Sequence, residues 1–334
     1  MENFENIAIS SRVRLARNLS DFKFGALLKQ EEARLLISSV FDALDKAGEF
    51  DYYLLSDMST TECNSLLERH LISKELIENR DIAGLALSEL DQIYIMLCEE
   101  DHIREQCIED GFNLYKPLRK LAQIDNVLLS ELKIAYDDKF GFLTSCPTNL
   151  GAGMRASVML FLPALEKAGQ MENLFEQVKI DGLTIRGIYG EGSLALGSFY
   201  QVSNQRSLGL SESEIVDKVS EFVYMVAEME QQARDELKES SLDEIKDEVM
   251  RAYAILKGSY LLAEDEMIVL LSKLRLGHAM GLLQISDMRA FSNLYFEGAS
   301  ANLKVITNFD ENKKENRVRS EYISMKLEKL ISLL

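Results

Sequence analysis

The chain has 334 residues and a formal net charge of −18, with 55 acidic residues against 37 lysines and arginines. At about 100–200 residues per domain, this length predicts two domains. The acidic balance argues against nucleic acid as a partner, because a nucleic-acid interface needs a dense basic surface. The sequence shows neither an apolar run long enough to span a bilayer nor the features of a secretory signal, so we expect a cytoplasmic protein without a membrane partner.

The first two-thirds of the chain mix helical and strand-like patterns. Residues 30–46 carry apolar side chains at helical spacing and predict a helix. The apolar run that ends at Leu97 predicts a strand that delivers the acidic sequence CEEDH to its end. Residues 183–189 and 199–203 predict two strands joined by a glycine-rich loop. A further helix is expected to begin near Met154.

The last third of the chain reads almost entirely as helix, which places a domain boundary near residue 225. The amphipathic pattern predicts four helices, at 212–239, 242–258, 264–276 and 320–334. We interpret the polar segment 238–248 as a turn between helices, and the charged segment 308–319 as a solvated loop.

The cysteines are few and irregularly spaced, which fits neither a disulfide framework nor a CxxC metal site. We therefore expect four free thiols, at Cys63, Cys98, Cys107 and Cys146. We assign no residue as a metal ligand.

Two stretches of this acidic chain carry a local positive charge. Residues 6–20 contain three arginines and no acid, and residues 139–165 also lack Asp and Glu. A guanidinium stays protonated and offers a planar fork of donors that fits phosphate oxygens. Arginines from separate segments can therefore hold a triphosphate together, and the candidates are Arg12, Arg14, Arg104, Arg155, Arg186 and Arg206. Any nucleotide must be held this way, because the chain has neither a P-loop nor the HRD and DFG motifs of protein kinases.

Two carboxylates and one thiol complete the candidate chemistry. Glu100 of CEEDH and Glu191 of YGEG could hold a guanidinium in line and help to remove its proton. Cys146 precedes a proline, and amides of the helix expected near Met154 would favour its thiolate. Each feature alone has a simpler interpretation: surface charge for the arginines, a solvated strand end for the acids, and apolar packing for the cysteine.

Five motifs follow one another along the chain: SSRVRLARN, LLERH, CEEDHIR, SCPTNLGAGMRASV and TIRGIYGEG. In order and spacing they resemble the phosphagen (ATP:guanido) kinases, and most of all the bacterial protein-arginine kinases. The resemblance is strong from about Ser10 to Leu210. It implies an α+β fold, with a phosphagen-kinase-like antiparallel sheet flanked by helices over 1–225 and an all-helical C-terminal domain over 226–334.

The resemblance also implies ligands and site residues. ATP and Mg²⁺ would bind across the sheet, Glu100 and Glu191 would clamp the guanidinium, and Cys146 would be a thiol on the substrate side. Five segments would line the nucleotide: Ser10, Ser11, Arg12, Val13 and Arg14; His70; Arg104; Arg155, Ala156, Ser157, Val158 and Met159; and Arg186, Gly187, Ile188, Tyr189 and Gly190. The sequence departs from the family pattern at Cys98, where Asn is usual, and at Ala152, where Thr is usual.

The order of the segments bears on the substrate. Kinases of free guanidino metabolites resemble one another in a helical domain ahead of the SxRVR motif, whereas here the motif begins at Ser10 and the helical segment follows. As in protein-arginine kinases, that segment would serve dimerisation and docking of protein substrates that present arginine. An activator protein and a protease chaperone such as ClpC are further expected partners. The RDxxRA motif that forms a phosphoarginine pocket in those kinases corresponds to ENRVRS at 315–320, where only Arg319 fits, so that pocket is not predicted.

Two other functions stay open. One is a kinase of a free guanidino metabolite. The other is a catalytically weak adaptor that binds arginine-rich clients, although the joint presence of both glutamates and the arginines argues against it.

Overall fold

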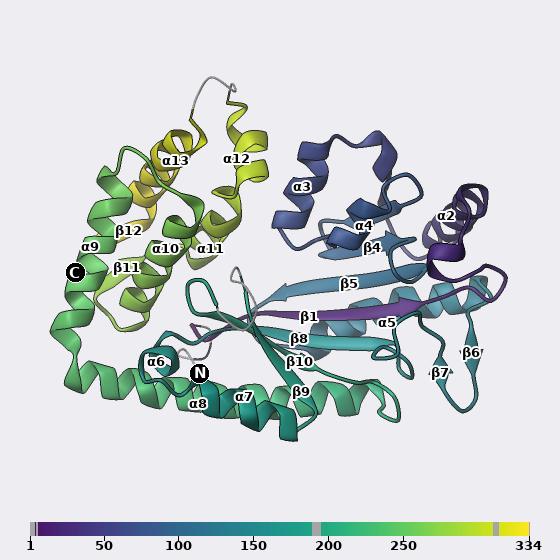
Figure 1. Ribbon diagram of the computed structural model, residues 1–334, viewed down its shortest axis with the longest axis horizontal. Helices are drawn as coiled ribbons and strands as arrows, with labels where there is room; N and C mark the ends of the chain where they lie inside the picture. The colour runs from purple at the N-terminus through teal and green to yellow at the C-terminus, as the bar shows by residue number, and fades with distance from the viewer. Residues whose placement is uncertain (1–3, 5, 189–194, 310–313, 334) are drawn as a thin grey trace.

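The computed structural model describes residues 4, 6–188, 195–309 and 314–333 (Figure 1). At its centre lies an eight-stranded sheet in which every neighbouring pair of strands is antiparallel. From edge to edge the strands are β2 (Asp51–Leu54), β3 (Gly84–Ser88), β4 (Ile93–Leu97), β5 (Ile103–Asp110), β1 (Ala8–Arg17), β8 (Met154–Phe161), β10 (Phe199–Asn204) and β9 (Leu183–Gly187). The expected α+β fold with an antiparallel sheet is confirmed.

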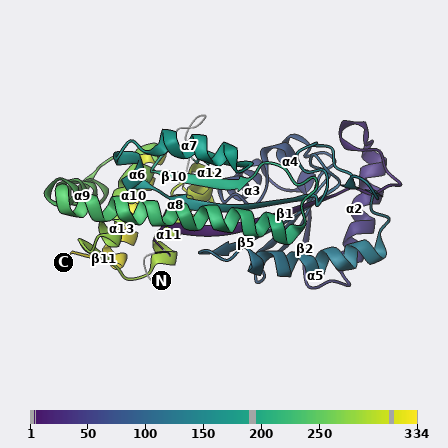
Figure 2. The same cartoon turned by 90° about the horizontal axis from the view of Figure 1, so that it is seen from below.

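Helices cover one face of this sheet. The strands are contacted by α5 (Tyr115–Glu131), α7 (Met171–Ile180) and α8 (Glu212–Ser240). Helix α2 (Gln30–Leu44) packs beside α5, and α6 (Pro163–Lys167) packs beside α8. Figure 2 shows α8 running along the sheet. Because side chains alternate along a strand, every second residue points into this core, and in β1 these are Val13 and Leu15. The side chains that alternate with these, including Arg12 and Arg14, lie on the opposite face.

Part of that opposite face is covered at the β2–β4 edge. There α3 (Thr60–Glu68) and α4 (Lys74–Glu78) enclose a small core with side chains of β3 and β4, such as Leu85 and Met96. The chain between α5 and β8 forms a small hairpin of β6 (Tyr136–Asp137) and β7 (Gly141–Phe142). Short 3₁₀ turns lie at Gly25–Leu27 and Leu55–Asp57.

The C-terminal part is helical and has its own core. Its elements are α9 (Leu242–Gly258), α10 (Glu264–Ala279), β11 (Leu283–Ile285), α11 (Met288–Glu297), α12 (Ser300–Thr307), α13 (Glu315–Leu330) and β12 (Ile331–Leu333). The core contains Leu271, Phe291 and Ile323, and it also receives Phe161 and Phe199 from the sheet. In the described part of the chain, no helix combines the length and apolar character needed to cross a bilayer.

Several expected elements are confirmed, namely the helix at 30–46 as α2, the strand ending at Leu97 as β4, and the two strands at 183–189 and 199–203 as β9 and β10. The long helix expected from residue 212 is α8. The boundary expected near residue 225 falls within this helix, which continues to Ser240 and turns into α9 after Ser241 (Figure 1).

Three other expectations about local structure were wrong. The helix expected near Met154 is strand β8, whose buried residues alternate with residues on the other face. The turn expected at 238–248 is helical apart from Ser241, because its Lys, Glu and Leu residues favour helix. Helix α13 begins at Glu315 within the segment expected to be a loop, and Arg319 is buried.

Arg319 is held by internal contacts. Its Nε donates to the Gly298 carbonyl at 2.6 Å, and its Nη1 donates to the Leu262 carbonyl at 3.1 Å. It also forms an ion pair with Glu315. These contacts fix the turn between α11 and α12 against α13.

On the helix-covered side of the sheet, the buried side chain of Arg17 fixes the junction between the end of β1 and the start of β8. Arg17 donates from Nε and Nη2 to the two carboxylate oxygens of Asp125 at 3.0 and 2.8 Å, and from Nη1 to the Ala16 carbonyl at 2.9 Å. Its guanidinium also stacks on Phe142, 3.6 Å from the ring centroid. Gly153 packs against this group in a left-handed conformation, with φ +61°.

Gly153→Ala is expected to lower the free energy of unfolding by about 2–4 kcal/mol, the sum of left-handed strain and overpacking. The new Cβ would lie 2.5 Å from Arg17 Nη1 and 2.7 Å from the Ala16 carbonyl oxygen. Gly169 is the matched control, because it has φ +68° but nothing within 4 Å of an added Cβ. Urea denaturation should show a clearly smaller loss for Gly169→Ala, and equal losses would contradict the packing argument.

Glu105 lies in the same buried region, fully shielded from solvent on β5. Burial, followed by repulsion from Asp125, raises its pKa well above the ordinary value. Folding raises the pKa of this carboxyl group, so the folded state holds its proton more tightly than the unfolded chain does. As the pH rises above the pKa of the unfolded chain, this difference lowers the free energy of unfolding, and Glu105 therefore destabilises the protein at neutral pH.

Glu105→Gln is therefore expected to raise the free energy of unfolding at pH 7 by about 1–3 kcal/mol. The difference should shrink as the pH falls toward 4.5, the ordinary glutamate value. Denaturation curves at several pH values check this, with the exposed Glu89→Gln as a control that should change stability by less than about 0.5 kcal/mol. A Glu105→Gln protein less stable than the wild type at pH 7 would refute the prediction.

Candidate active site

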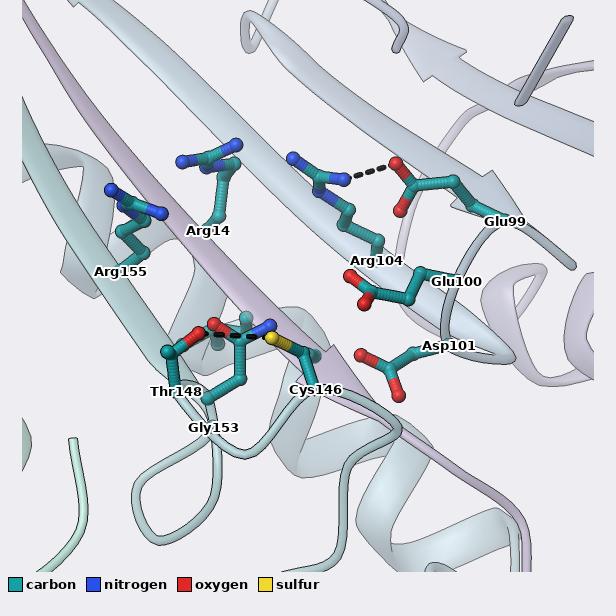
Figure 3. Close-up of a pocket in the computed structure, with 12 residues that line it drawn as sticks. Arg14, Glu99, Glu100, Asp101, Arg104, Cys146, Thr148, Gly153 and Arg155 are labelled. Carbon is teal, nitrogen blue, oxygen red and sulfur yellow. Dashed lines mark hydrogen bonds and ion pairs between the residues drawn. The ribbon is translucent and has the colours of Figure 1, made fainter. Parts of the chain in front are cut away.

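Arginines from β5, β1, β8 and β9 share the face of the sheet opposite the helices. Strand register places Arg14 opposite Arg155, Ala16 opposite Arg104, and Gln201 opposite Arg186, and directly paired residues point to the same face. We call this surface the arginine face, and its arginines are Arg12, Arg14, Arg104, Arg155 and Arg186. Figure 3 shows three of them, Arg14, Arg104 and Arg155, directed toward a common space.

The arginine face carries excess positive charge. Burial, followed by repulsion from Arg104 and Arg155, lowers the pKa of Arg12 to about 10. Burial and the neighbouring arginines also lower the pKa of Arg14 well below its ordinary value. Among the residues that the structure describes, no carboxylate forms an ion pair with either side chain, and the two Nε atoms lack hydrogen-bond acceptors. Such a cluster is suited to binding a polyanion.

Opposite these arginines, the turn between β4 and β5 presents the acids of CEEDH. Cys98 begins the turn with φ +60°, a left-handed conformation in which Asn, the usual family residue here, is enriched. The Asn79 amide fixes the turn by donating to the carbonyls of Cys98 and Glu99 at 3.2 and 3.0 Å. Glu99 is buried and forms an ion pair with Arg104, whereas Glu100 is exposed toward the cavity (Figure 3).

The environment of Glu100 favours its protonated form. Burial raises its pKa, and the negative charges of Asp101 and Glu99 raise it further, while Arg104 opposes them. A carboxylate with a raised pKa is a stronger proton acceptor once it is ionised. Glu100 therefore has the properties of a general base.

The two residues after Glu100 have structural partners. Asp101 accepts hydrogen bonds from the Asn18 amide at 2.6 Å and from the Ser145 backbone N–H at 2.7 Å. His102 Nδ1 accepts from the Leu19 backbone N–H at 3.0 Å. Asp101 thereby ties the acidic turn to the loop that carries Cys146.

Cys146 lies in the loop before β8, half-buried, with its Sγ 3.0 Å from Thr148 Oγ1. No helix follows it, so helix N-terminal amides do not act on the thiol as expected from the sequence. The loop nevertheless brings the thiol to the same small cavity as Glu100 (Figure 3). This cavity, of about 100 Å³, is lined by Arg14, Leu15, Ala16, Glu99, Glu100, Asp101, Arg104, Cys146, Thr148, Asn149, Gly153 and Arg155.

A second cavity, of about 160 Å³, lies along the same face beyond Arg12. It is lined by Ser10, Arg12, Arg69, His70, Ile108, Ser157, Met159, Ile188, Gln201 and Phe296. We call it the base cavity, because Ile108, Met159, Ile188 and Phe296 give it an apolar wall that a flat ring could contact. His70 has φ +58° there, and burial followed by repulsion from Arg12 lowers its pKa to about 4, which keeps the ring neutral.

The structure sorts the predicted site residues into three groups. One group lines the two cavities or the arginine face: Ser10, Arg12, Arg14, His70, Glu100, Arg104, Cys146, Arg155, Ser157, Met159, Arg186 and Ile188. A second group, Ser11, Val13, Ala156 and Val158, points to the other face and is buried, so these side chains are not brought to the site. Tyr189, Gly190 and Glu191 lie outside the described residues, and Gly187 ends β9 beside the site.

One predicted arginine lies away from the two cavities, and three residues of the site were not predicted. Arg206 is exposed and lines neither cavity. Sequence reasoning missed Glu99 as the partner of Arg104, Ser203 as the partner of Arg155 at 3.1 Å, and Phe296 as a wall of the base cavity. The position of Glu99 beside Glu100 was a usable signal for the first of these. Nothing local in the sequence pointed to Phe296.

Comparison with known proteins gives matches over most of the chain. A family model described as "ATP:guanido phosphotransferase, C-terminal catalytic domain" matches residues 32–233, and one described as "Protein-arginine kinase McsB C-terminal domain" matches residues 242–332. The chain is 39% identical to a protein-arginine kinase of Clostridium kluyveri, over 96% of this chain and 94% of the relative. It is 43% identical to a protein-arginine kinase of Shouchella clausii, over 84% of this chain and 79% of the relative.

Solved structures of related kinases share the fold. The substrate-free duplicated taurocyamine kinase of Schistosoma mansoni has 28% identity and a TM-score of 0.62, over 77% of this chain and 39% of that longer chain. A lombricine kinase has 26% identity and a TM-score of 0.58, over 68% of this chain and 67% of that one.

Proposed function

The chain belongs to the protein-arginine kinases of the ATP:guanido phosphotransferase family, and from this we propose how its residues transfer the γ-phosphate of ATP to arginine side chains of proteins. The observation that carries the proposal is the arrangement of half-buried arginines directly opposite Glu100. Phosphoryl transfer depends mainly on positioning and on stabilisation of charge, and this face supplies both.

The arginine face would hold the triphosphate. Arg12, Arg14 and Arg155 come from the rigid centre of the sheet, so their guanidinium groups are positioned before the nucleotide binds. Arg104 is held by Glu99 and adds a donor near the reacting phosphate. The base cavity beyond Arg12 would take the adenine.

Glu100 would act on the acceptor. The carboxylate accepts a proton from the arginine guanidinium while one guanidinium nitrogen forms a bond to the γ-phosphorus. The bond between the γ-phosphorus and the β–γ bridging oxygen breaks, and its electron pair leaves with ADP. Glu191 is proposed from the family resemblance as the second clamping carboxylate, and Cys146 as a contact of the bound guanidinium.

Magnesium would enter as part of the substrate MgATP. The described residues contain no cluster of three or more side chains able to hold a metal ion. Such a cluster is not required, because Mg²⁺ keeps several water ligands and is bound largely through substrate phosphates with one or two carboxylates. Among the carboxylates at the cavity, Glu100 is exposed, and Glu99 has one oxygen, Oε2, without a hydrogen-bond partner. These two groups would be available to the ion's water shell.

The remaining parts of the proposal rest on the family resemblance. We propose two domains that meet at Ser241, the break between α8 and α9, with the C-terminal one serving dimerisation and substrate docking. A cytoplasmic location, an activator protein and a partnership with a protease chaperone are proposed on the same basis. The relatives' names favour a protein substrate over a free guanidino metabolite and over an adaptor without activity.

The test is to incubate the purified protein with MgATP and an unfolded arginine-containing protein such as casein, and in parallel with free arginine. Mass spectrometry under conditions that preserve acid-labile N–P bonds should find phosphate on arginine side chains of casein. Turnover of ATP with free arginine but not with casein would indicate a metabolite kinase. No turnover with either substrate, with or without candidate activator proteins, would favour the adaptor.

A further inference from the structure

The base cavity is bounded by both halves of the chain. Eight of its ten lining residues belong to the sheet and the segment after α3, the ninth is Ile188, which directly follows β9, and the tenth is Phe296, near the end of α11. The Phe296 ring lies edge-to-face on the His70 ring, with centroids 5.8 Å apart and planes at 86°. A residue from the helical C-terminal part therefore forms one wall of a cavity that opens along the arginine face.

His70 is held rigidly where it meets Phe296. Its left-handed backbone is fixed by hydrogen bonds from its N–H to the Leu67 carbonyl at 2.9 Å, and from the Gln106 amide to its own carbonyl at 3.0 Å. Gln106 lies opposite Arg14 on the arginine face. The backbone of His70 thus has a fixed position relative to the proposed phosphate site, and its ring packs against Phe296.

Phe296 is positioned by a second contact between the two halves. The Glu68 carboxylate, at the end of α3, accepts hydrogen bonds from the backbone N–H groups of Ala301 and Asn302 at 2.8 and 2.9 Å, in the first turn of α12. It also accepts from the Asn302 side-chain amide at 2.8 Å, and Ser65 donates to the same side chain at 2.7 Å. Figure 1 shows α3 and α12 side by side. Glu68 stabilises the N-terminus of α12 and so fixes the short turn that joins α12 to the end of α11, where Phe296 lies.

We propose that Phe296 contacts the adenine base of ATP, so that the nucleotide site is shared between the sheet and the helical C-terminal part. The inference rests on the proposed function, because it takes the arginine face as the triphosphate site. A flat aromatic base packed against the His70–Phe296 ring pair and the apolar side chains of Ile108 and Met159 would exchange water for apolar and ring contacts. Since Glu68 positions Phe296, loosening the α3–α12 contact also weakens nucleotide binding.

The test compares a ligand that has the base with one that lacks it. Dissociation constants for MgATP and for magnesium tripolyphosphate are measured by calorimetry with the full-length protein. Phe296→Ala should weaken MgATP binding by about tenfold, equivalent to about 1.4 kcal/mol, and change tripolyphosphate binding by less than about twofold. Phe296→Leu, which keeps apolar volume and guards against misfolding, should weaken MgATP binding by about threefold. In kinetic assays the KM for ATP should rise in both variants, while kcat changes little.

Two further variants test whether the α3–α12 contact acts on nucleotide binding through Phe296. Glu68→Gln should weaken MgATP binding in the same selective way but by less, about threefold, because it acts through Phe296. Val305→Ala, an exposed position of α12, should leave both ligands unaffected. Equal MgATP affinity in the wild type and in both Phe296 variants, or an equal loss for the two ligands, would overturn the inference. A wild type that binds neither ligand would instead overturn the proposed function.

Discussion

Glu100→Gln is expected to lower kcat for arginine phosphorylation by about 10²–10⁴-fold, the contribution typical of a general base. Glutamine keeps the shape of the side chain but cannot accept the proton of the guanidinium. The dissociation constant of MgATP should change by less than about threefold, because the proposed phosphate contacts come from the arginine face. Steady-state kinetics with casein, combined with calorimetry of nucleotide binding, measure both quantities. A variant that retains more than about a tenth of wild-type kcat would remove Glu100 from the proposed role.

The pH dependence of kcat/KM provides a second test of the role of Glu100. Burial and the charges of Asp101 and Glu99 raise the pKa of Glu100, so the wild-type kcat/KM should fall as the pH drops through a value above the ordinary glutamate pKa. This acid limb should be absent from the residual activity of Glu100→Gln. Glu75 is a suitable control, because its charge also raises the pKa of Glu100. Glu75→Gln should move the limb to lower pH and leave the rate at neutral pH unchanged.

Arg14→Met is expected to lower kcat/KM by about 10²–10³-fold, as is usual when a group that stabilises transition-state charge is lost. The same change should make the unliganded protein more stable. Burial and the nearby arginines lower the pKa of Arg14, which means that its positive charge costs folding free energy, and methionine keeps most of the packed volume without the charge.

Thermal unfolding with and without MgATP separates the two effects. The unliganded Arg14→Met protein should melt at a higher temperature than the wild type, and MgATP should no longer raise its melting temperature. Arg206→Met, an exposed arginine that lines neither cavity, should behave like the wild type in both conditions. Loss of activity with a lower melting temperature would show that Arg14 supports the fold rather than the nucleotide.

The sequence motifs located the site but not the side of the sheet on which each residue lies. Arg12, Arg14 and Arg155 were predicted together because their segments lack acids, and register confirms that they are neighbours. Val13 and Ala156 were included because the motifs are contiguous in sequence. The expectation of a helix beginning near Met154 hid the period of two by which every second side chain of β8 points into the core.

Contacts between distant segments were not predictable from the sequence. Glu68 lies in the LLERH motif beside His70, but its partners are in the first turn of α12. Phe296 belongs to an amphipathic helix whose pattern indicates only that one face is covered. Which helix face meets which strand depends on packing of the two halves of the chain, and no local pattern records it.

The most direct test of the account is a crystal structure of the protein with MgADP, nitrate as a planar substitute for the transferring phosphoryl group, and an arginine-containing peptide. We expect the phosphates and the nitrate to contact Arg12, Arg14, Arg104 and Arg155. The peptide guanidinium should lie within hydrogen-bond distance of the Glu100 carboxylate. We also expect the adenine to pack against the His70–Phe296 ring pair. Nucleotide bound away from the arginine face, or a guanidinium out of reach of Glu100, would contradict it.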